Sequence, residues 1–237
     1  MTSNHTQSIA RTTVTVIIPT RNAARFLNQA IDSVLAQTYP VDEIIVVDGN
    51  SGDRSRDIAL SYSQVTLVEQ PVTGLGDAWN AGIDAAHSEW IAFLDSDDLW
   101  LPEKIENQIQ ALKQNPDAGL IDGKVRFFLE SGQKLPKSFR PEQLNVESVG
   151  FMPTTWLVKR SVFDLIGTFD SSLEVAVDID WYQRLRDAGT PIIAIDKLVA
   201  HKRVHQENLS LSTRSQAVYN HELIGLIKQS LNRRQRS

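Results

Sequence analysis

Four short runs of apolar, mostly β-branched residues recur within the first hundred positions, and the segments between them carry apolar residues at helical spacing. Continuous runs of this length predict buried strands, and helical crossovers are what parallel strands need as connections. The order strand, helix, strand therefore predicts an α/β fold with a mostly parallel central sheet covered by helices. The expected strands are residues 14–18, 43–47, 65–68 and 90–94, and the expected helices are residues 24–37, 54–61 and 77–86.

The second half of the chain is less regular. Pro19 is expected to stop the first strand, and Gly189 to end a late helix as a C′ glycine. We predict one domain: a flexible tail (1–13), a regular first half (14–100), a less regular second half (101–215), and a C-terminal amphipathic helix with a basic tail (216–237). In the second half, the patterns predict helices over 102–114, 178–188 and 216–231, strands over 119–129, 151–158, 192–195 and 198–200, and a long active-site loop over 131–148.

Composition excludes several classes of function. The net charge of -5 argues against a nucleic-acid-binding surface, which normally carries a basic excess. The absence of cysteine excludes disulfides, thiolate zinc sites and cysteine nucleophiles, and suits a reducing cytoplasm. The first 13 residues lack the apolar core of a signal peptide, and no apolar run is long enough to span a bilayer. The expected location is cytoplasmic, with at most peripheral contact at the inner face of the membrane.

The last of the four strands ends in an acidic cluster. Asp95, Asp97 and Asp98 follow the apolar run 90–94 within four positions. Carboxylates this close repel one another unless a cation lies among them. Ligands of open α/β sheets bind at the carboxyl ends of strands, and oxygen ligands suit Mg²⁺ or Mn²⁺. The residues alone leave two readings open: a metal-bridged phosphate site, or a solvated acidic turn that caps the next helix.

Four motifs in register decide between these readings. They are residues 16–22 (VIIPTRN), 44–53 (IIVVDGNSGD), 93–98 (FLDSDD) and 178–185 (DIDWYQRL), followed by a late His-containing segment at 201–210. Together they resemble the family-2 inverting glycosyltransferases with the GT-A fold, over roughly residues 14–210. The resemblance implies a GT-A-type, Rossmann-like α/β/α sandwich, a nucleotide-diphosphate sugar as donor, a Mn²⁺ or Mg²⁺ cofactor, and transfer of one hexosyl unit with inversion in cell-surface polysaccharide or glycoconjugate synthesis.

The resemblance makes residues 14–100 the nucleotide-sugar-binding half and residues 101–215 the acceptor and catalytic half. It also implies roles for individual residues on the donor side. Asp97 would bind the metal directly, with Asp95 near the ribose and metal and with His205 returning from the late segment as a further ligand. Arg203 would offer the diphosphate a permanent positive charge. The remaining expected donor contacts are Pro19, Thr20, Arg21 and Asn22 after the first strand, Asp48 toward the base, and Ser96 within the acidic cluster.

On the acceptor side, the resemblance assigns the catalytic base to Asp178, with Asp180 as the second candidate. A carboxylate there can take the proton from the attacking hydroxyl, and an Asp that opens a helix is also a natural N-cap. Two departures from the family pattern stand out. Val177 occupies the place of a usual acidic neighbour, and Trp79 replaces a basic residue and is expected to pack in the core.

Two further classes of function remain open. A sugar-phosphate nucleotidyltransferase shares an α/β nucleotide-binding framework, although the turn after the first strand lacks the glycines that such an enzyme would use. A non-catalytic nucleotide-sugar-binding protein of the same fold is the other alternative. The expected acceptor is a saccharide or a glycolipid, contacted from the irregular stretch 131–156, and the sequence is compatible with an oligomer.

Overall fold

The predicted alternation of strands and helices is present in the computed structural model, which describes residues 11–208, 218–219 and 221–226. The first four strands pair in parallel in the order β3-β2-β1-β4, which confirms the parallel half of the sheet. Their bounds are β1 (Val14–Thr20), β2 (Glu43–Asp48), β3 (Val65–Glu69) and β4 (Trp90–Phe93), and they are joined by α1 (Leu27–Leu35), α2 (Ser55–Leu60) and α3 (Leu75–Ala85).

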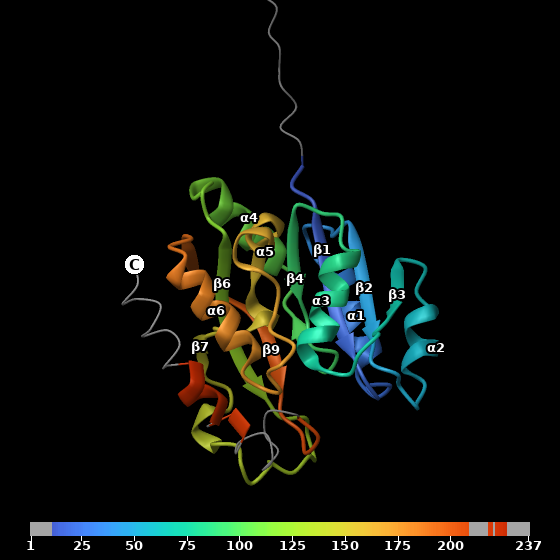
Figure 1. The fold of residues 1–237 in the computed structure, drawn as a ribbon. Helices are drawn as coiled ribbons and strands as arrows, with labels where there is room; N and C mark the ends of the chain where they lie inside the picture. The colour runs from blue at the N-terminus through green and yellow to red at the C-terminus, as the bar shows by residue number, and fades with distance from the viewer. Residues whose placement is uncertain (1–10, 209–217, 220, 227–237) are drawn as a thin grey trace, which may run out of the picture.

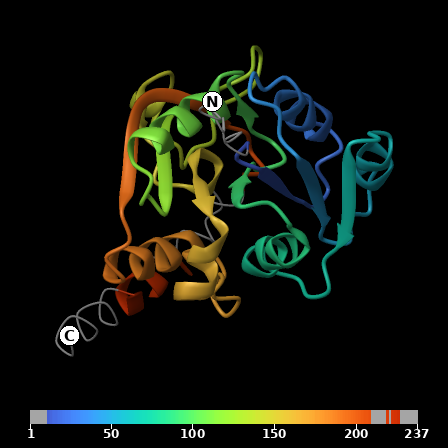
Figure 2. The same ribbon diagram turned by 90° about the horizontal axis from the view of Figure 1, so that it is seen from above.

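The side chains of successive residues of β1 pack alternately into two separate hydrophobic cores, one on each face of the sheet. Val16 and Ile18 belong to the cluster that contains the apolar face of α1, and Ile17 belongs to the cluster that contains Trp79 and Ile83 of α3. Figures 1 and 2 show α1 and α3 on opposite sides of the strands. The two cores make the first half an α/β/α sandwich, as predicted.

Close contact between α3 and β1 depends on Gly82. A Cβ at this position would lie 2.4 Å from Cγ2 of Ile17, a fully buried side chain in the middle of the sheet. Helix propensity alone would favour Gly82→Ala by about 1 kcal/mol. We expect the steric overlap with Ile17 to outweigh the gain in helix propensity. The free energy of unfolding, measured by urea denaturation, should then fall by about 1–3 kcal/mol. Asp84→Ala on the exposed side of α3 is the control; a Gly82→Ala variant that gains stability would contradict this packing.

The second half continues the sheet with mixed pairing, in the order β4-β8-β6-β9-β5, with β7 paired to β6. β8 is antiparallel to both β4 and β6, whereas β6 and β9 run parallel. The elements are β5 (Leu99–Trp100), α4 (Lys104–Gln114), β6 (Leu120–Phe128), β7 (Glu147–Val149), β8 (Leu157–Lys159), α5 (Arg160–Ile166), α6 (Val177–Asp187) and β9 (Ile192–Arg203), with short 3₁₀ turns at Pro141–Gln143 and Pro153–Thr155.

The prediction that Pro19 stops the first strand was wrong, because β1 continues to Thr20. The Ile17 carbonyl accepts a hydrogen bond from Leu94, while the Thr20 carbonyl accepts one from Gly49 beyond β2. The backbone N–H and C=O positions of residues 17 and 19 therefore point toward β4, and the pairing of β4 with β1 ends at Phe93. Because Pro19 lies past that end, its missing N–H breaks no ladder bond and the strand continues along β2 to Thr20.

Three further predictions in the second half need correction. Residues 151–158 are not one strand, because Phe151 is left-handed and Pro153–Thr155 form a 3₁₀ turn before β8. The two short strands expected over 192–200 are one strand, β9, whose register against β6 shifts near Lys124. The predicted loop over 131–148 contains the 3₁₀ turn Pro141–Gln143 and the start of β7, and the two-residue strand β5, which was not predicted, pairs with β9. Gly189 does follow α6 with a positive φ of 70°, as predicted.

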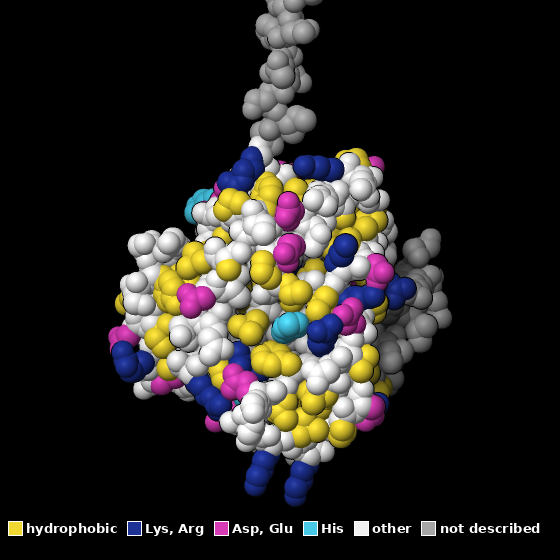
Figure 3. All heavy atoms as spheres, turned by 180° about the vertical axis from the view of Figure 1, so that it is seen from behind, with side chains coloured by type: hydrophobic (Ala, Val, Ile, Leu, Met, Phe, Trp, Pro, Cys, Tyr) yellow, Lys and Arg dark blue, Asp and Glu magenta, His cyan; other side chains and the backbone are white. Residues whose placement is uncertain are grey.

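Within the described residues, helices are too short and too polar to cross a bilayer. On the face drawn in Figure 3, Lys and Arg side chains are scattered among acidic and apolar ones rather than gathered in one patch. The predicted tail (1–13) and the C-terminal helix (216–231) lie largely outside the described residues. Of that helix, residues 218–219 and 221–226 are helical and lie beneath α6 in Figure 1.

Candidate active site

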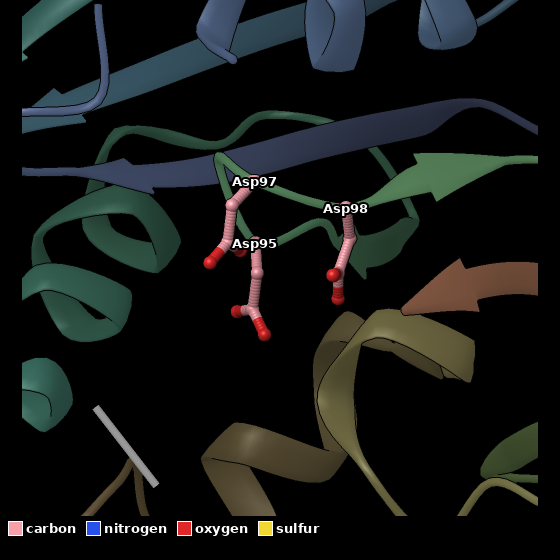
Figure 4. A group of neighbouring side chains, drawn as sticks. All are labelled: Asp95, Asp97 and Asp98. Carbon is pink, nitrogen blue, oxygen red and sulfur yellow. The ribbon is translucent and has the colours of Figure 1, made fainter. Parts of the chain in front are cut away.

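The acidic cluster forms a tight turn between β4 and β5. The Asp98 N–H donates to the Asp95 carbonyl over 3.0 Å, which folds the three carboxylates back on one another. Figure 4 shows all three side chains pointing to the same side of this segment. One oxygen from each lies within 4.8 Å of the others. The turn thus concentrates negative charge at the carboxyl end of the parallel strands.

Lys202 of β9 neutralises part of that charge. Its Nζ lies 2.7 Å from Oδ2 of Asp95 and 3.0 Å from Oδ2 of Asp98. Burial lowers the pKa of Lys202, but the charges of the three aspartates outweigh burial and hold it well above its ordinary value. Asp98 is fully buried, and burial raises its pKa to about 8 although Lys202 opposes that shift. Asp98 therefore anchors β9 rather than capping the following helix.

Asp97 receives hydrogen bonds from the segment after β9. Its Oδ2 lies 2.8 Å from Nε2 of His205 and 3.2 Å from Nδ2 of Asn208. The Glu207 N–H donates to Nδ1 of His205, which assigns the imidazole proton to Nε2 in a neutral ring. Burial raises the pKa of Asp97, yet the His205 hydrogen bond and the charge of Lys202 outweigh it and the pKa lies below its usual value. Asp97 is therefore ionised at neutral pH.

Arg203 fixes the backbone of the acidic turn. Its side chain is 2% exposed and packs between the rings of Phe26 and Phe128. Nε donates to the Asp97 carbonyl over 2.7 Å, Nη1 pairs with Glu130, and Nη2 donates to Gln29. The predicted contact with a diphosphate stays a prediction; the geometry favours a positioning role for Arg203 instead.

Asp178 lies in the first turn of α6, and the charges of Asp95 and Lys202 act on it across the site. Burial, with a smaller contribution from the charge of Asp95, raises the pKa of its carboxyl to about 6, although local N–H groups and Lys202 oppose the rise. The expected N-cap role is wrong, because α6 begins one residue earlier. Glu222 of the C-terminal segment accepts the N–H groups of 174–176 that precede the helix.

Asp180, the second candidate base, is engaged elsewhere. Its Oδ2 lies 2.8 Å from Nε of Arg184, one turn along α6. Arg184 also donates to the carbonyls of residues 166, 167 and 168, which join α6 to the end of α5. This ion pair explains the presence of Asp180 by a structural role. Asp178 is therefore the stronger candidate for proton transfer.

The predicted donor turn after β1 is locked to the loop after β2. Asn22, with a φ of 52°, donates through its N–H to Oγ of Ser51 and accepts the Gly52 N–H on Oδ1. Asp53 accepts the Ala24 N–H and also bonds Ser55 at the start of α2. Pro19 and Thr20 are buried, whereas Arg21 and Asn22 are exposed at the rim. The clamp explains why α1 begins at Leu27, later than predicted.

Asp48, the predicted contact to the base, has a partner within the protein. Asp48, at the end of β2, is 1% exposed and lies 3.2 Å from Nη1 of Arg56. Ser96 lies in the turn between Asp95 and Asp97. Trp79 is 3% exposed and its ring centroid lies 4.7 Å from that of Phe169, which confirms the expected core packing. The donor roles of Asp48 and Ser96 stay predictions.

The residues at the acidic turn fit a divalent cation. Carboxylate oxygens from Asp95, Asp97 and Asp98 converge within 4.8 Å, and His205 contacts the same oxygen of Asp97 as Asn208 does. Hard oxygen donors with an imidazole nearby suit Mg²⁺ or Mn²⁺. The sequence reasoning missed Lys202, Asn208 and Glu222. Lys202 had a usable signal, because three neighbouring carboxylates require a cation.

Comparison with known proteins identifies a family whose model matches more than half of the chain. The model of the family described as "Glycosyl transferase family 2" matches residues 15–168. An uncharacterized glycosyltransferase of Rickettsia typhi is 37% identical over 190 residues, covering 73% of this chain and 58% of that protein. The chain spans 34–61% of the length of the first three curated relatives that it matches.

Solved structures show the same fold at low sequence identity. A mannosyltransferase from Pyrobaculum calidifontis, solved with GDP-Man and Mn²⁺, superposes with a TM-score of 0.71 at 21% identity, over 94% of this chain and 65% of that one. Residues 1–349 of S. aureus TarS, solved with UDP-GlcNAc, give a TM-score of 0.69 at 20% identity, over 87% and 64%. The fold is therefore the GT-A fold.

Proposed function

The chain belongs to glycosyl transferase family 2, and from that premise we propose that it moves a sugar from a nucleotide-diphosphate donor to a hydroxyl of a saccharide or glycolipid acceptor, with inversion and with bound Mn²⁺ or Mg²⁺. One observation carries the proposal. In a chain of this family, the acidic turn 95–98 brings three carboxylates within 4.8 Å of one another, directly after the parallel strand β4. Membership of the family favours sugar transfer over nucleotidyl transfer.

Each part of the site has a task in this reaction. Asp97 and Asp95 would hold the cation, which when bound supplies positive charge beside the leaving diphosphate. For His205 to join them as a ligand through Nε2, its proton would have to move to Nδ1, and the ring would give up its hydrogen bonds to Asp97 and to the Glu207 N–H. The locked loops after β1 and β2 would receive the nucleoside. Asp178 takes the proton from the acceptor hydroxyl as that oxygen attacks the anomeric carbon from the face opposite the leaving group. This opposite-face attack gives inversion, and an intact candidate base favours an enzyme over a non-catalytic binding protein.

The biological setting is proposed on the same basis. Donors of the solved relatives are nucleotide sugars, UDP-GlcNAc and GDP-Man. A hexosyl donor of this class, used in the cytoplasm for cell-surface polysaccharide or glycoconjugate synthesis, is the role that we propose. The donor response can be measured without knowing the acceptor.

Donor binding can be tested by thermal unfolding. A saturating nucleotide sugar at about 100 times its Kd adds about 2.7 kcal/mol. For a chain of this size, that raises Tm by about 5–10 °C. We expect such a rise with UDP-GlcNAc or GDP-mannose only when Mn²⁺ or Mg²⁺ is present. Asp97→Asn should lose most of it, because an amide is a much weaker cation ligand than a carboxylate.

Asp117→Asn, which replaces an exposed carboxylate in the turn after α4, is the matched control and should respond as the wild type does. A wild-type protein that responds to no nucleoside-diphosphate sugar with either metal would contradict the proposed donor. An Asp97→Asn variant with a full metal-dependent response would contradict the assignment of the cation to the acidic turn.

A further inference from the structure

Phe151 combines two unfavourable properties. Its backbone is left-handed, with a φ of 47°, a region that bulky residues avoid. Its side chain is 56% exposed, so the aromatic ring stays in water. Backbone strain of this kind persists only where the surrounding structure enforces it, and it gathers at functional sites. Packing alone explains neither property.

A buried hydrogen-bond network enforces this backbone. Asp122 of β6 is 1% exposed and accepts the Phe151 N–H over 3.0 Å and the Thr155 hydroxyl over 2.5 Å. The Gly150 N–H donates to the carbonyl of Gly123. A side chain at Gly150 would begin 2.2 Å from Oγ1 of Thr155, so the segment can pass this close only as glycine.

A second tier of polar groups supports the same segment from beneath. Lys104 of α4 is fully buried, and its Nζ donates to Gln108 over 2.7 Å and to the Trp156 carbonyl over 3.1 Å. Nε2 of Gln108 donates to the carbonyl of Thr155 over 2.8 Å. Burying an ammonium group is unfavourable, and here its donors fix the segment that presents Phe151.

The ring of Phe151 stands beside the candidate base. Its centroid lies 5.7 Å from that of Tyr182, edge to face, and Tyr182 in turn stacks on buried Trp156. Tyr182 follows Asp178 by four residues on α6, so the two share one face of the helix about 6 Å apart. Burial, and next the charge of Asp178, raise the pKa of Tyr219 in the C-terminal segment.

Resting on the proposed function, we propose that Phe151, backed by Tyr182, is a stacking platform for a sugar ring of the acceptor, about one ring away from the hydroxyl at Asp178. A pyranose has an apolar C–H face and a polar rim, which suits an exposed aromatic face beside polar groups. The acceptor is then a saccharide chain of at least two units. Its terminal sugar reaches Asp178, and the preceding sugar lies on Phe151.

The platform can be tested by removing the ring while keeping the backbone. Asn adopts the left-handed conformation far more readily than Phe, so Phe151→Asn should fold and unfold at or above the wild-type temperature. We expect saturation-transfer NMR, with UDP or GDP and diamagnetic Mg²⁺ present, to detect binding of at least one of N,N′-diacetylchitobiose, cellobiose and maltose by the wild type. Phe151→Asn should weaken that binding about tenfold, and Phe151→Trp should restore it.

Leu60→Asn on α2, another exposed apolar residue far from the site, is the matched control and should bind as the wild type does. Equal binding by wild type and Phe151→Asn, or binding of none of these disaccharides by the wild type, would overturn the platform. The rise in Tm with donor and Mn²⁺ should be the same for wild type and Phe151→Asn. Its absence from the wild type would instead overturn the proposed function.

Discussion

Asp178→Asn should lower kcat for sugar transfer by about 10²–10⁴-fold and leave the donor-dependent rise in Tm unchanged. The amide cannot take the proton of the acceptor hydroxyl, and a positioned base contributes rate enhancement of this order. Asp178 is not among the groups that would hold the donor or the cation, so donor binding should survive. Initial rates of nucleoside-diphosphate release with a saccharide acceptor, read beside thermal shifts, measure both quantities.

The pH dependence follows from the same group. Because burial raises the pKa of Asp178 to about 6, the base is charged at neutral pH and takes up a proton below about 6. The wild-type rate should therefore fall about tenfold per pH unit in the acid limb, and the residual activity of Asp178→Asn should lack that limb. A wild-type rate that is flat from pH 5 to 8 would exclude this carboxyl as the base.

The free energy of unfolding of the Asp178 and Asp180 variants distinguishes a catalytic role from a structural one. The folded pKa of Asp178 lies above its unfolded value, so the folded state binds the proton more tightly and its stability falls as pH rises from about 4 to about 6. Replacing the carboxyl by an amide removes the cost of ionising this group in the folded protein. Asp178→Asn should therefore be at least as stable as the wild type at pH 7.5. Asp180→Asn should instead lose stability through unpaired Arg184. If Asp180→Asn abolished transfer in folded protein while Asp178→Asn remained active, the assignment of the base would be reversed.

Local patterns were sufficient to predict the first half of the fold. Runs such as 14–18 are apolar on both faces because each face meets a different core, and this is why they read as buried parallel strands. Pro19 was misjudged because its effect depends on where the neighbouring strand β4 ends. The segment 151–158 was misjudged because a buried carboxylate, Asp122, overrides the strand preference of its apolar residues.

Parts of the candidate site that lie within one motif could be predicted from the sequence. Parts that combine side chains from distant segments could not. The acidic turn 95–98 and Asp178 stand in recognisable motifs. Glu222 caps the approach to α6 from about 45 residues away, and no local pattern pairs it with residues 174–176. The rings of Phe26 and Phe128 that hold the guanidinium of Arg203 likewise come from distant segments, while its contact with a diphosphate stays a prediction. Such roles depend on tertiary packing.

Lys202→Met should lower the free energy of unfolding by about 3–5 kcal/mol when divalent cations are removed by a chelator. Its ammonium contacts Asp95 and Asp98, and Asp98 is fully buried, so the variant leaves carboxylates without their cation. Urea denaturation with a chelator present measures the loss. Lys124→Met, which removes an ion pair with the exposed Asp196, is the matched control and should change stability by less than about 1 kcal/mol.

The same variant tests whether Lys202 and a divalent cation balance the same charge. Asp95 lies in the group of oxygens that fits a cation, and it is also the group closest to Nζ of Lys202. Removing the lysine increases the net negative charge at the turn, and like charges in a confined space favour a bound cation. Mn²⁺ should therefore stabilise Lys202→Met more than the wild type and recover part of the lost free energy. Equal stabilisation of both proteins by Mn²⁺ would mean that the cation binds outside the reach of Lys202, and the acidic turn would lose its assignment as the metal site.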